Sequence, residues 1–278
     1  MEYNLIEYPT HWIYNNDIII IKSHFNADIN SINFNDNIIS IVFNDYKKVE
    51  FMIKKLHDSN YKNYNNYDLS KFRQSIENLP PRIINLTFSD IFNQSVNNLP
   101  YNLQKLTFGY HFNQIVDNLP QNLQNLTFGY YFNQKVDNLP YNLQNLTFGY
   151  HFNQKVDNLP SNLQNLTFGY HFNKLVNNLP QTLLNITFDV KFNQLLDDLP
   201  NSIITIKFIH LHNDGYIEFN NELNCLPNSV CEIKFHFNYV QEIKNLPSKL
   251  KKIICSSKYP YINKLISNGI EIEYIDKN

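Results

Sequence analysis

A unit of twenty residues recurs along most of this chain without a change in length. The unit that begins at Leu119 reads LPQNLQNLTFGYYFNQKVDN, and the next, from Leu139, reads LPYNLQNLTFGYHFNQKVDN. The Leu-Pro pair that opens the unit returns every twenty residues from Leu79 to Leu199. A short fixed period is typical of stacked coils, in which each coil contacts only its neighbours. The period therefore predicts a solenoid.

Each unit contains one strand pattern. In Leu126-Thr127-Phe128, residues that favour strands alternate between the interior and the exterior. The remaining residues are too few for a full helix on the return side, so we expect extended or short 3₁₀ segments there. Pro140 stiffens the turn into the next coil. The predicted fold is a β-solenoid of leucine-rich-repeat type. It has one parallel sheet, few or no full helices on the convex side, and a small capping helix near the C-terminus.

Residues at the same position of successive units form what we call a column. One column of glycine and one of asparagine shape the predicted coils. Glycine closes the strand in four successive units, where we expect a positive φ or a tight bend. Asparagine follows the second phenylalanine of each unit, and an inward amide there can satisfy backbone groups of neighbouring coils. The glycines are Gly109, Gly129, Gly149 and Gly169, and the predicted structural ladder is Asn93, Asn113, Asn133, Asn153, Asn173 and Asn193.

The period weakens on both sides of the regular run. A solenoid exposes an apolar cross-section at each end, so atypical capping segments are expected there. We predict one structural domain with five parts. These are an N-terminal cap with a degenerate coil (1–33), degenerate coils with an irregular loop (34–78), six regular repeats (79–198), three looser repeats with an insertion near 210–220 (199–257), and a C-terminal cap (258–278).

Low charge limits the classes of partner. Charged residues make up 17% of the chain and the net charge is -2. Nucleic acids and membrane surfaces attract basic faces, so we expect neither as a partner. The first thirty residues lack the basic start and the continuous apolar run of a secretory signal. Three cysteines without a C-x-x-C pair favour a reducing setting, and we predict a cytoplasmic protein.

The consensus LPxNLxxLTFGxxFNQxVxNLP over residues 79–198 resembles the FNIP repeat, a short relative of the leucine-rich repeat. The resemblance implies a leucine-rich-repeat-like fold and protein partners, and it supplies no catalytic residues. Such asparagine-rich proteins are common in social amoebae and giant DNA viruses, which would place a viral member in the host cytoplasm. Many carry an N-terminal F-box that docks on a ubiquitin ligase. Residues 1–33 are not the leucine-rich helical sequence of an F-box, so we expect a member without one.

The outward columns are the candidate binding surface. Tyrosine offers rigid aromatic area and asparagine offers adaptable hydrogen bonding, and both suit protein contacts. We therefore predict a protein-interaction scaffold, with a link to substrate recognition for ubiquitin ligases suggested by the resemblance. The alternatives are a carbohydrate-binding solenoid and a structural protein without a specific partner. The candidate contact residues are Asn125, Asn145, Asn165, Thr127, Thr147, Thr167, Tyr110, Tyr130, Tyr150 and Tyr170.

Catalytic chemistry has little support in the sequence. No Ser-His-Asp set, phosphate-binding loop or metal-spaced cluster is present. His111, His151 and His171 share one column, but two neighbouring imidazoles without a carboxylate or thiolate make a poor metal site. We predict no enzyme activity, no cofactor and no metal.

Overall fold

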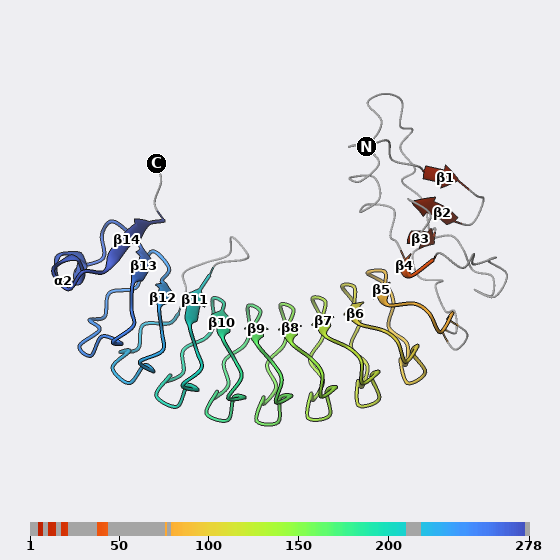
Figure 1. The fold of residues 1–278 in the computed structure, drawn as a ribbon, viewed down its shortest axis with the longest axis horizontal. Helices are drawn as coiled ribbons and strands as arrows, with labels where there is room; N and C mark the ends of the chain where they lie inside the picture. The colour runs from red at the N-terminus through yellow and green to blue at the C-terminus, as the bar shows by residue number, and fades with distance from the viewer. Residues whose placement is uncertain are drawn as a thin grey trace. The chain divides into compact units, whose positions relative to one another are not determined.

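The structure, a computed structural model, describes residues 18–21, 38–43, 76, 79–209 and 218–275, and the backbone of residues 5–7 and 11–14. It divides into two compact units, Met1–Phe132 and Asn133–Asn278, whose elements are labelled in Figure 1. The twenty-residue sequence period continues across this boundary. The predicted boundaries of the five parts stay predictions.

In the described part of Met1–Phe132, seven strands form one sheet. β1 pairs antiparallel with β2, and β2 with β3. From β3 onward the pairs are parallel, and Leu86 lies opposite Leu106, which lies opposite Leu126. One coil therefore adds one strand in register. The strands are β1 (Leu5–Glu7), β2 (His11–Tyr14), β3 (Ile18–Ile21), β4 (Ser40–Phe43), β5 (Asn85–Thr87), β6 (Lys105–Thr107) and β7 (Asn125–Thr127).

In the described part of Asn133–Asn278, seven strands pair in parallel. Ile206 lies opposite Ile233, so the longer coil between them keeps its register in the sheet. α2 is the only α-helix among the residues that the structure describes. The elements are β8 (Asn145–Thr147), β9 (Asn165–Thr167), β10 (Asn185–Phe188), β11 (Thr205–Phe208), β12 (Glu232–Lys234), β13 (Lys252–Cys255), α2 (Ile262–Ser267) and β14 (Glu271–Tyr274).

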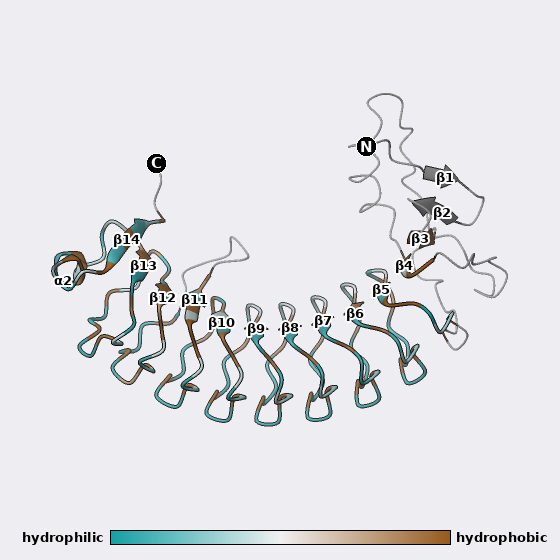
Figure 2. Cartoon of the chain, in the orientation of Figure 1, coloured by the Kyte–Doolittle hydropathy of each residue, from teal (hydrophilic) through white to brown (hydrophobic). Residues whose placement is uncertain are grey.

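The core repeats from coil to coil. In the coil of β8, the inward side chains Leu143, Leu146, Phe148, Phe152 and Val156 are all buried. Figure 2 shows hydrophobic and hydrophilic segments recurring in the same order along successive coils. The two rings of this coil stack with centroids 3.6 Å apart. Each buried ring contributes roughly 1.5–3 kcal/mol by burial of apolar area. These observations confirm the predicted β-solenoid of leucine-rich-repeat type.

The glycine column is explained by close contact between coils. A Cβ added to Gly109 would lie 2.0 Å from the carbonyl oxygen of Ser89, and one on Gly169 would lie 2.1 Å from that of Gly149. Among the described residues, the glycine with a positive φ is Gly269, at +78°. The expectation of a positive φ in the column was therefore wrong. The constraint is the carbonyl of the preceding coil, which leaves no room for a side chain.

The C-terminal cap forms as predicted, from a helix followed by a strand. α2 buries Leu265, and its C-cap is Asn268. Gly269 then takes its positive φ, and the backbone N–H of Ile270 donates to the carbonyl of Leu265 (3.1 Å). β14 follows and pairs with β13. The irregular loop expected at 45–70 and the core of the insertion, residues 210–217, lie outside the described residues.

Candidate interaction surface

The asparagines of the sheet face bond largely to one another. The Nδ2 of Asn165 donates to Oδ1 of Asn145 (2.6 Å), and the Nδ2 of Asn185 donates to Oδ1 of Asn165 (2.7 Å). In the other unit, the Nδ2 of Asn85 donates to Ser40 Oγ (2.9 Å). Parallel strands in register place identical side chains about 4.8 Å apart, which suits such an amide ladder. A partner would therefore meet amides that are already engaged.

The other sheet-face candidates lie beside this ladder. Asn125 is half-buried, as are the three threonines that lie two positions after the asparagines on the same strands. Lys105 replaces asparagine in the coil of β6 and is exposed. The sheet face is thus a shallow polar surface rather than a row of projecting contact groups. The half-buried threonines are Thr127, Thr147 and Thr167.

Four aromatic residues form what we call the first ridge, along the turn that follows the sheet in Met1–Phe132: Tyr110, His111, Tyr130 and Tyr131. Tyr110 stacks on Tyr130 with centroids 4.4 Å apart, and His111 stacks on Tyr131 at 5.3 Å. Tyr110 also meets the ring of Tyr131 edge-on at 5.0 Å. The turn is held by the N–H of Tyr131, which donates to the carbonyl of Tyr110 (2.9 Å). Tyr110 and Tyr131 are 38% and 41% exposed.

The second ridge occupies the same turn in Asn133–Asn278, and consists of Tyr150, His151, Tyr170, His171 and Lys191. The tyrosines stack at 4.5 Å and the histidines at 5.1 Å. The Nζ of Lys191 lies 5.9 Å from the Tyr170 ring centroid and bonds to Oε1 of Glu218 (2.5 Å). Tyr170 is only 9% exposed. The four tyrosines that the sequence treats alike therefore differ in accessibility.

Two ring side chains of the ridges, those of Tyr110 and His171, have pKa values shifted toward their uncharged forms. The pKa of the Tyr110 hydroxyl is raised, first by loss of surrounding water and then by the neighbouring phenols of Tyr131 and Tyr130. The pKa of His171 is lowered, first by desolvation and then by repulsion from His151 and Lys191. A neutral imidazole stacks on its neighbour without charge repulsion. The rings therefore present edges and hydroxyl groups, and the second ridge adds the ion pair of Lys191 with Glu218.

The asparagine column predicted as a structural ladder links consecutive coils through backbone groups. The N–H of Asn153 donates to Oδ1 of Asn133 (2.9 Å), and the N–H of Asn173 donates to Oδ1 of Asn153 (3.0 Å). The N–H of Asn113 likewise donates to Asn93 (2.9 Å). These side chains are half-buried, and Asn93 is exposed. The ladder therefore runs along the surface of the coils, which corrects the expectation that it points inward. Its last link joins Asn193 to Asn173 (3.0 Å).

Sequence reasoning missed the glutamines that follow this ladder. The Nε2 of Gln154 donates to both the carbonyl oxygen (3.0 Å) and the Oδ1 (3.1 Å) of Asn133. Gln114 and Gln194 make the corresponding bonds to Asn93 and Asn173. The signal was present, because Asn-Gln recurs after the second phenylalanine of the unit.

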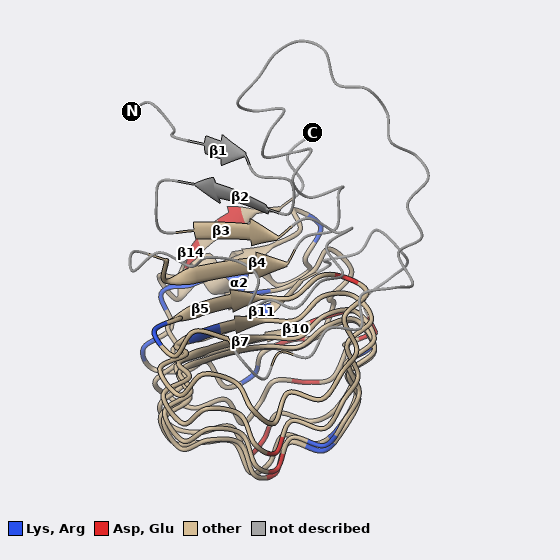
Figure 3. Ribbon diagram, turned by 90° about the vertical axis from the view of Figure 1, so that its right-hand side faces the viewer, with Lys and Arg blue, Asp and Glu red and all other residues tan. Residues whose placement is uncertain are grey.

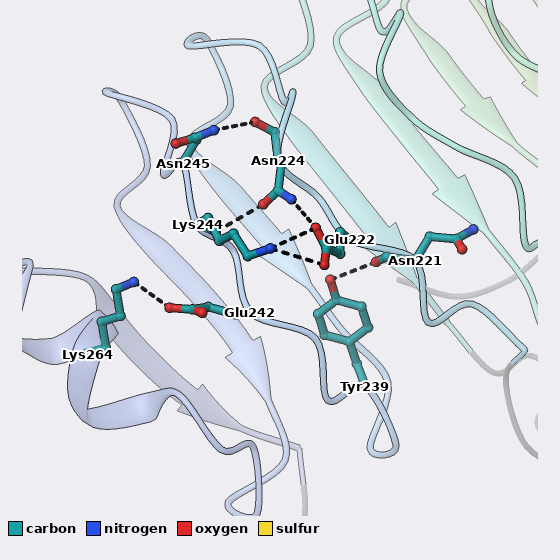
Figure 4. A network of polar contacts seen from close by, with 8 residues as sticks. All are labelled: Asn221, Glu222, Asn224, Tyr239, Glu242, Lys244, Asn245 and Lys264. Carbon is teal, nitrogen blue, oxygen red and sulfur yellow. Dashed lines mark hydrogen bonds and ion pairs between the residues drawn. The ribbon is translucent and has the colours of Figure 1, made fainter.

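Ion pairs join the last coils on the side away from the sheet. In Figure 3 most of the ribbon is uncharged, and Figure 4 shows the polar network of these coils. Lys244 pairs with Glu222 (3.2 Å), and Lys264 of α2 pairs with Glu242 (2.5 Å). The buried Tyr239 donates its hydroxyl to the carbonyl of Asn221 (3.0 Å), and burial raises the pKa of this hydroxyl. Charged pairs thus add to the coil-to-coil bonds of asparagine, which continue here because the N–H of Lys244 donates to Oδ1 of Asn224 (3.1 Å).

Metal sites and membrane-spanning helices are both absent from the part of the chain that the structure describes. No group of three or more histidines, cysteines, aspartates or glutamates is arranged to hold a metal ion there. No helix there has both the length and the hydrophobicity needed to cross a membrane.

The family model described as FNIP Repeat matches five overlapping stretches, residues 72–111, 92–131, 112–151, 132–171 and 152–191. The chain contains FNIP repeats. No curated protein sequence matches this FNIP-repeat chain.

One solved structure, "The crystal structure of CroV588 a novel circular LRR protein structure", is 27% identical to the FNIP-repeat chain, with a TM-score of 0.60. It covers 93% of the chain, which in turn spans only 43% of CroV588. This likeness supports the leucine-rich-repeat-like fold. YopM from Yersinia enterocolitica WA-314 is 19% identical, covering 64% of the chain and 56% of YopM. Its TM-score of 0.30 is too low to bear on fold or function.

Proposed function

We propose that this FNIP-repeat protein is a non-enzymatic scaffold that binds a protein partner through its two aromatic ridges. The observation that carries the proposal is the exposed cluster of Tyr110, His111 and Tyr131 in the first ridge. Interfaces between proteins are enriched in tyrosine, because it buries a large rigid ring and still offers a hydroxyl group. Leucine-rich-repeat-like solenoids are suited to this role since they present extended surfaces.

The ridges are favoured over the sheet face for a physical reason. The sheet-face amides of Asn145 and Asn165 already bond within their ladder (2.6 Å). Binding there would exchange existing hydrogen bonds for new ones, with little net gain. The exposed edges of Tyr110 and Tyr131, by contrast, lose water when a partner covers them, and burial of apolar area is favourable.

A carbohydrate ligand fits these ridges less well. Sugars stack on an open aromatic face, whereas the faces of Tyr150 and Tyr170 pack against each other at 4.5 Å. The Nζ of Lys191 also lies over the ring of Tyr170, 5.9 Å from its centroid. We therefore keep the protein partner as the proposal. A link to ubiquitin ligases rests on the family resemblance alone and forms no part of it.

We further propose that the protein works in the cytoplasm, the host's if the protein is viral. Cys225 and Cys231 form no disulfide bond in the structure. Thiols in this state are typical of reducing compartments.

The test is a capture experiment with matched tyrosine variants. The tagged chain is used to capture proteins from an amoebal lysate, and the affinity of each enriched protein is then measured with purified components. The double variant His111→Ala with Tyr131→Ala should weaken binding roughly 10- to 100-fold if the first ridge holds anchoring residues. Tyr101→Ala is the control, because Tyr101 is 67% exposed but precedes the strand, away from the ridge. Equal affinities for the ridge variant and the control would refute the proposed surface.

A further inference from the structure

The sheet-face asparagines also belong to a sequence pattern that enzymes can modify. In five strands it reads Asn-x-Thr, which is the acceptor sequence for N-linked glycosylation. The column is broken once, in the coil of β6, where Lys105 stands in place of asparagine. One further acceptor sequence lies outside the column, at Asn93-Gln94-Ser95. The five sites in the column are Asn85, Asn125, Asn145, Asn165 and Asn185.

The fold uses the very atom that a glycan would occupy. Transfer forms a bond from the sugar C1 to Nδ2, breaks the bond from C1 to the diphosphate of the lipid-linked donor, and releases one amide proton. The Nδ2 of Asn165 is only 2.6 Å from Oδ1 of Asn145, and that of Asn185 is 2.7 Å from Oδ1 of Asn165. All three side chains are half-buried. A sugar on Asn165 would therefore sit directly beside two other amides of the ladder.

The distance between strands leaves still less room for glycans, because the acceptor sites occur on consecutive strands. β8, β9 and β10 pair in register, so Asn145, Asn165 and Asn185 stand side by side. Parallel strands lie about 4.8 Å apart. A sugar ring with its substituents is wider than this spacing, so glycans on neighbouring sites cannot stand side by side on one flat sheet. Separating the strands to make room would break their backbone hydrogen bonds.

Asn93 offers the opposite environment within the same chain. Asn93 and Ser95 are exposed and lie away from the sheet. The side-chain oxygen of Asn93 accepts hydrogen bonds from the N–H of Asn113 (2.9 Å) and from Gln114 (3.0 Å). Glycosylation leaves this oxygen in place, so the two bonds survive.

We infer that folding of this chain and N-glycosylation of its sheet-face column exclude each other. Glycans added there before folding prevent the amide ladder and the sheet beneath it from closing. The protein therefore reaches its fold in a compartment without N-glycosylation, while Asn93 tolerates a glycan. This inference concerns the chain itself and stands independently of any partner.

The experiment directs the full chain into the secretory pathway of cultured eukaryotic cells with a cleavable signal, and compares it with the same chain made in the cytoplasm. Glycan occupancy at each site is measured by mass spectrometry after enzymatic deglycosylation, and folding is measured by cooperative melting and protease resistance. A second variant removes the acceptor sequences but keeps every asparagine. It carries Thr87→Val, Thr127→Val, Thr147→Val, Thr167→Val and Thr187→Val. A third arm blocks synthesis of the glycan donor in cells that secrete the natural chain.

The secreted natural chain should carry glycans in the column and lose cooperative melting. The valine variant should fold and be modified at Asn93 alone, and the natural chain should fold when the donor is blocked. Secreted natural chain that is folded and carries glycans in the column would overturn the inference. Misfolding that persists in the natural chain after the donor is blocked would also overturn it, because the glycan is then not the cause.

Discussion

Gly169→Ala tests how closely the coils approach each other. The new Cβ would lie 2.1 Å from the carbonyl oxygen of Gly149 and 2.5 Å from its carbonyl carbon. Both are backbone atoms, so no side chain can rotate away to relieve the contact. Ordinary contacts begin at 3.4 Å, and the two coils would have to separate locally by about 1.3 Å.

That displacement has a calculable cost. Just beyond the glycines, the N–H of His171 donates to the carbonyl of Tyr150 at 2.9 Å, and this pair would move out of hydrogen-bonding range. Losing one such bond costs about 0.5–1.5 kcal/mol, and a buried group left without a partner adds about 1–3 kcal/mol. We expect a total of about 1.5–4.5 kcal/mol. At roughly 2–4 °C per kcal/mol for a chain of this size, the melting temperature should fall by about 3–18 °C.

Thermal unfolding followed by circular dichroism or calorimetry measures this loss. Gly269→Ala is the matched control, because no atom lies within 4 Å of its added Cβ, although its φ of +78° adds strain. That strain costs about 1–2 kcal/mol. Asp189 stands in the same column one coil after Gly169, so the close approach is not repeated in every coil. A smaller loss for Gly169→Ala than for Gly269→Ala would refute the explanation by close contact.

Four other predictions concern single side chains. Asn153→Ala should cost about 1–3 kcal/mol in urea unfolding, because the Asn173 N–H loses its acceptor at 3.0 Å, while Asn153→Asp, which keeps an oxygen there, should cost less. Phe152→Ala removes a fully buried ring and should cost about 3–5 kcal/mol by calorimetry. The pKa of His171 is lowered in the folded chain. Below about pH 6.5 the unfolded chain therefore binds more protons at this residue, and the stability of the fold decreases as the pH falls. His171→Tyr should reduce this loss of stability, as measured by melting curves at a series of decreasing pH values. Glu242→Gln removes an exposed ion pair with α2 and should cost at most about 1 kcal/mol, with a smaller effect in high salt, by hydrogen exchange of the helix.

The repeat period was enough to predict the strand and the core, and the change of pattern from Lys258 onward predicted the C-terminal helix. Leu146 and Phe148 are buried where the alternating pattern places them, and Asn268-Gly269 ends α2 as its composition predicts. The antiparallel pairing of β2 with β3 was not predicted, because the repeat frame implies parallel strands throughout. Pairing direction depends on where a chain turns back, and a degraded repeat loses that signal.

The candidate surface was predicted less completely. The tyrosine column was identified, yet Tyr110 is 38% exposed while Tyr170 is buried. The two residues occupy the same position in their units, and they differ because Lys191 and its ion pair with Glu218 lie next to Tyr170. Lys191 belongs to the last regular unit, whereas Glu218 comes from the irregular coil that follows, and a sequence alone does not reveal the register of that coil.

The sequence by itself determined the coil: its length, its strand, its buried columns and its turns, since each follows from local alternation repeated at a constant interval. Only the tertiary structure decided which role the same type of residue has in each column. Asn153 accepts a backbone N–H, whereas Asn145 accepts a side-chain amide. Gly169 is required by a carbonyl of another coil, and its own φ imposes nothing. The physical reason is that these roles depend on distances between coils, and those distances arise only when the coils stack.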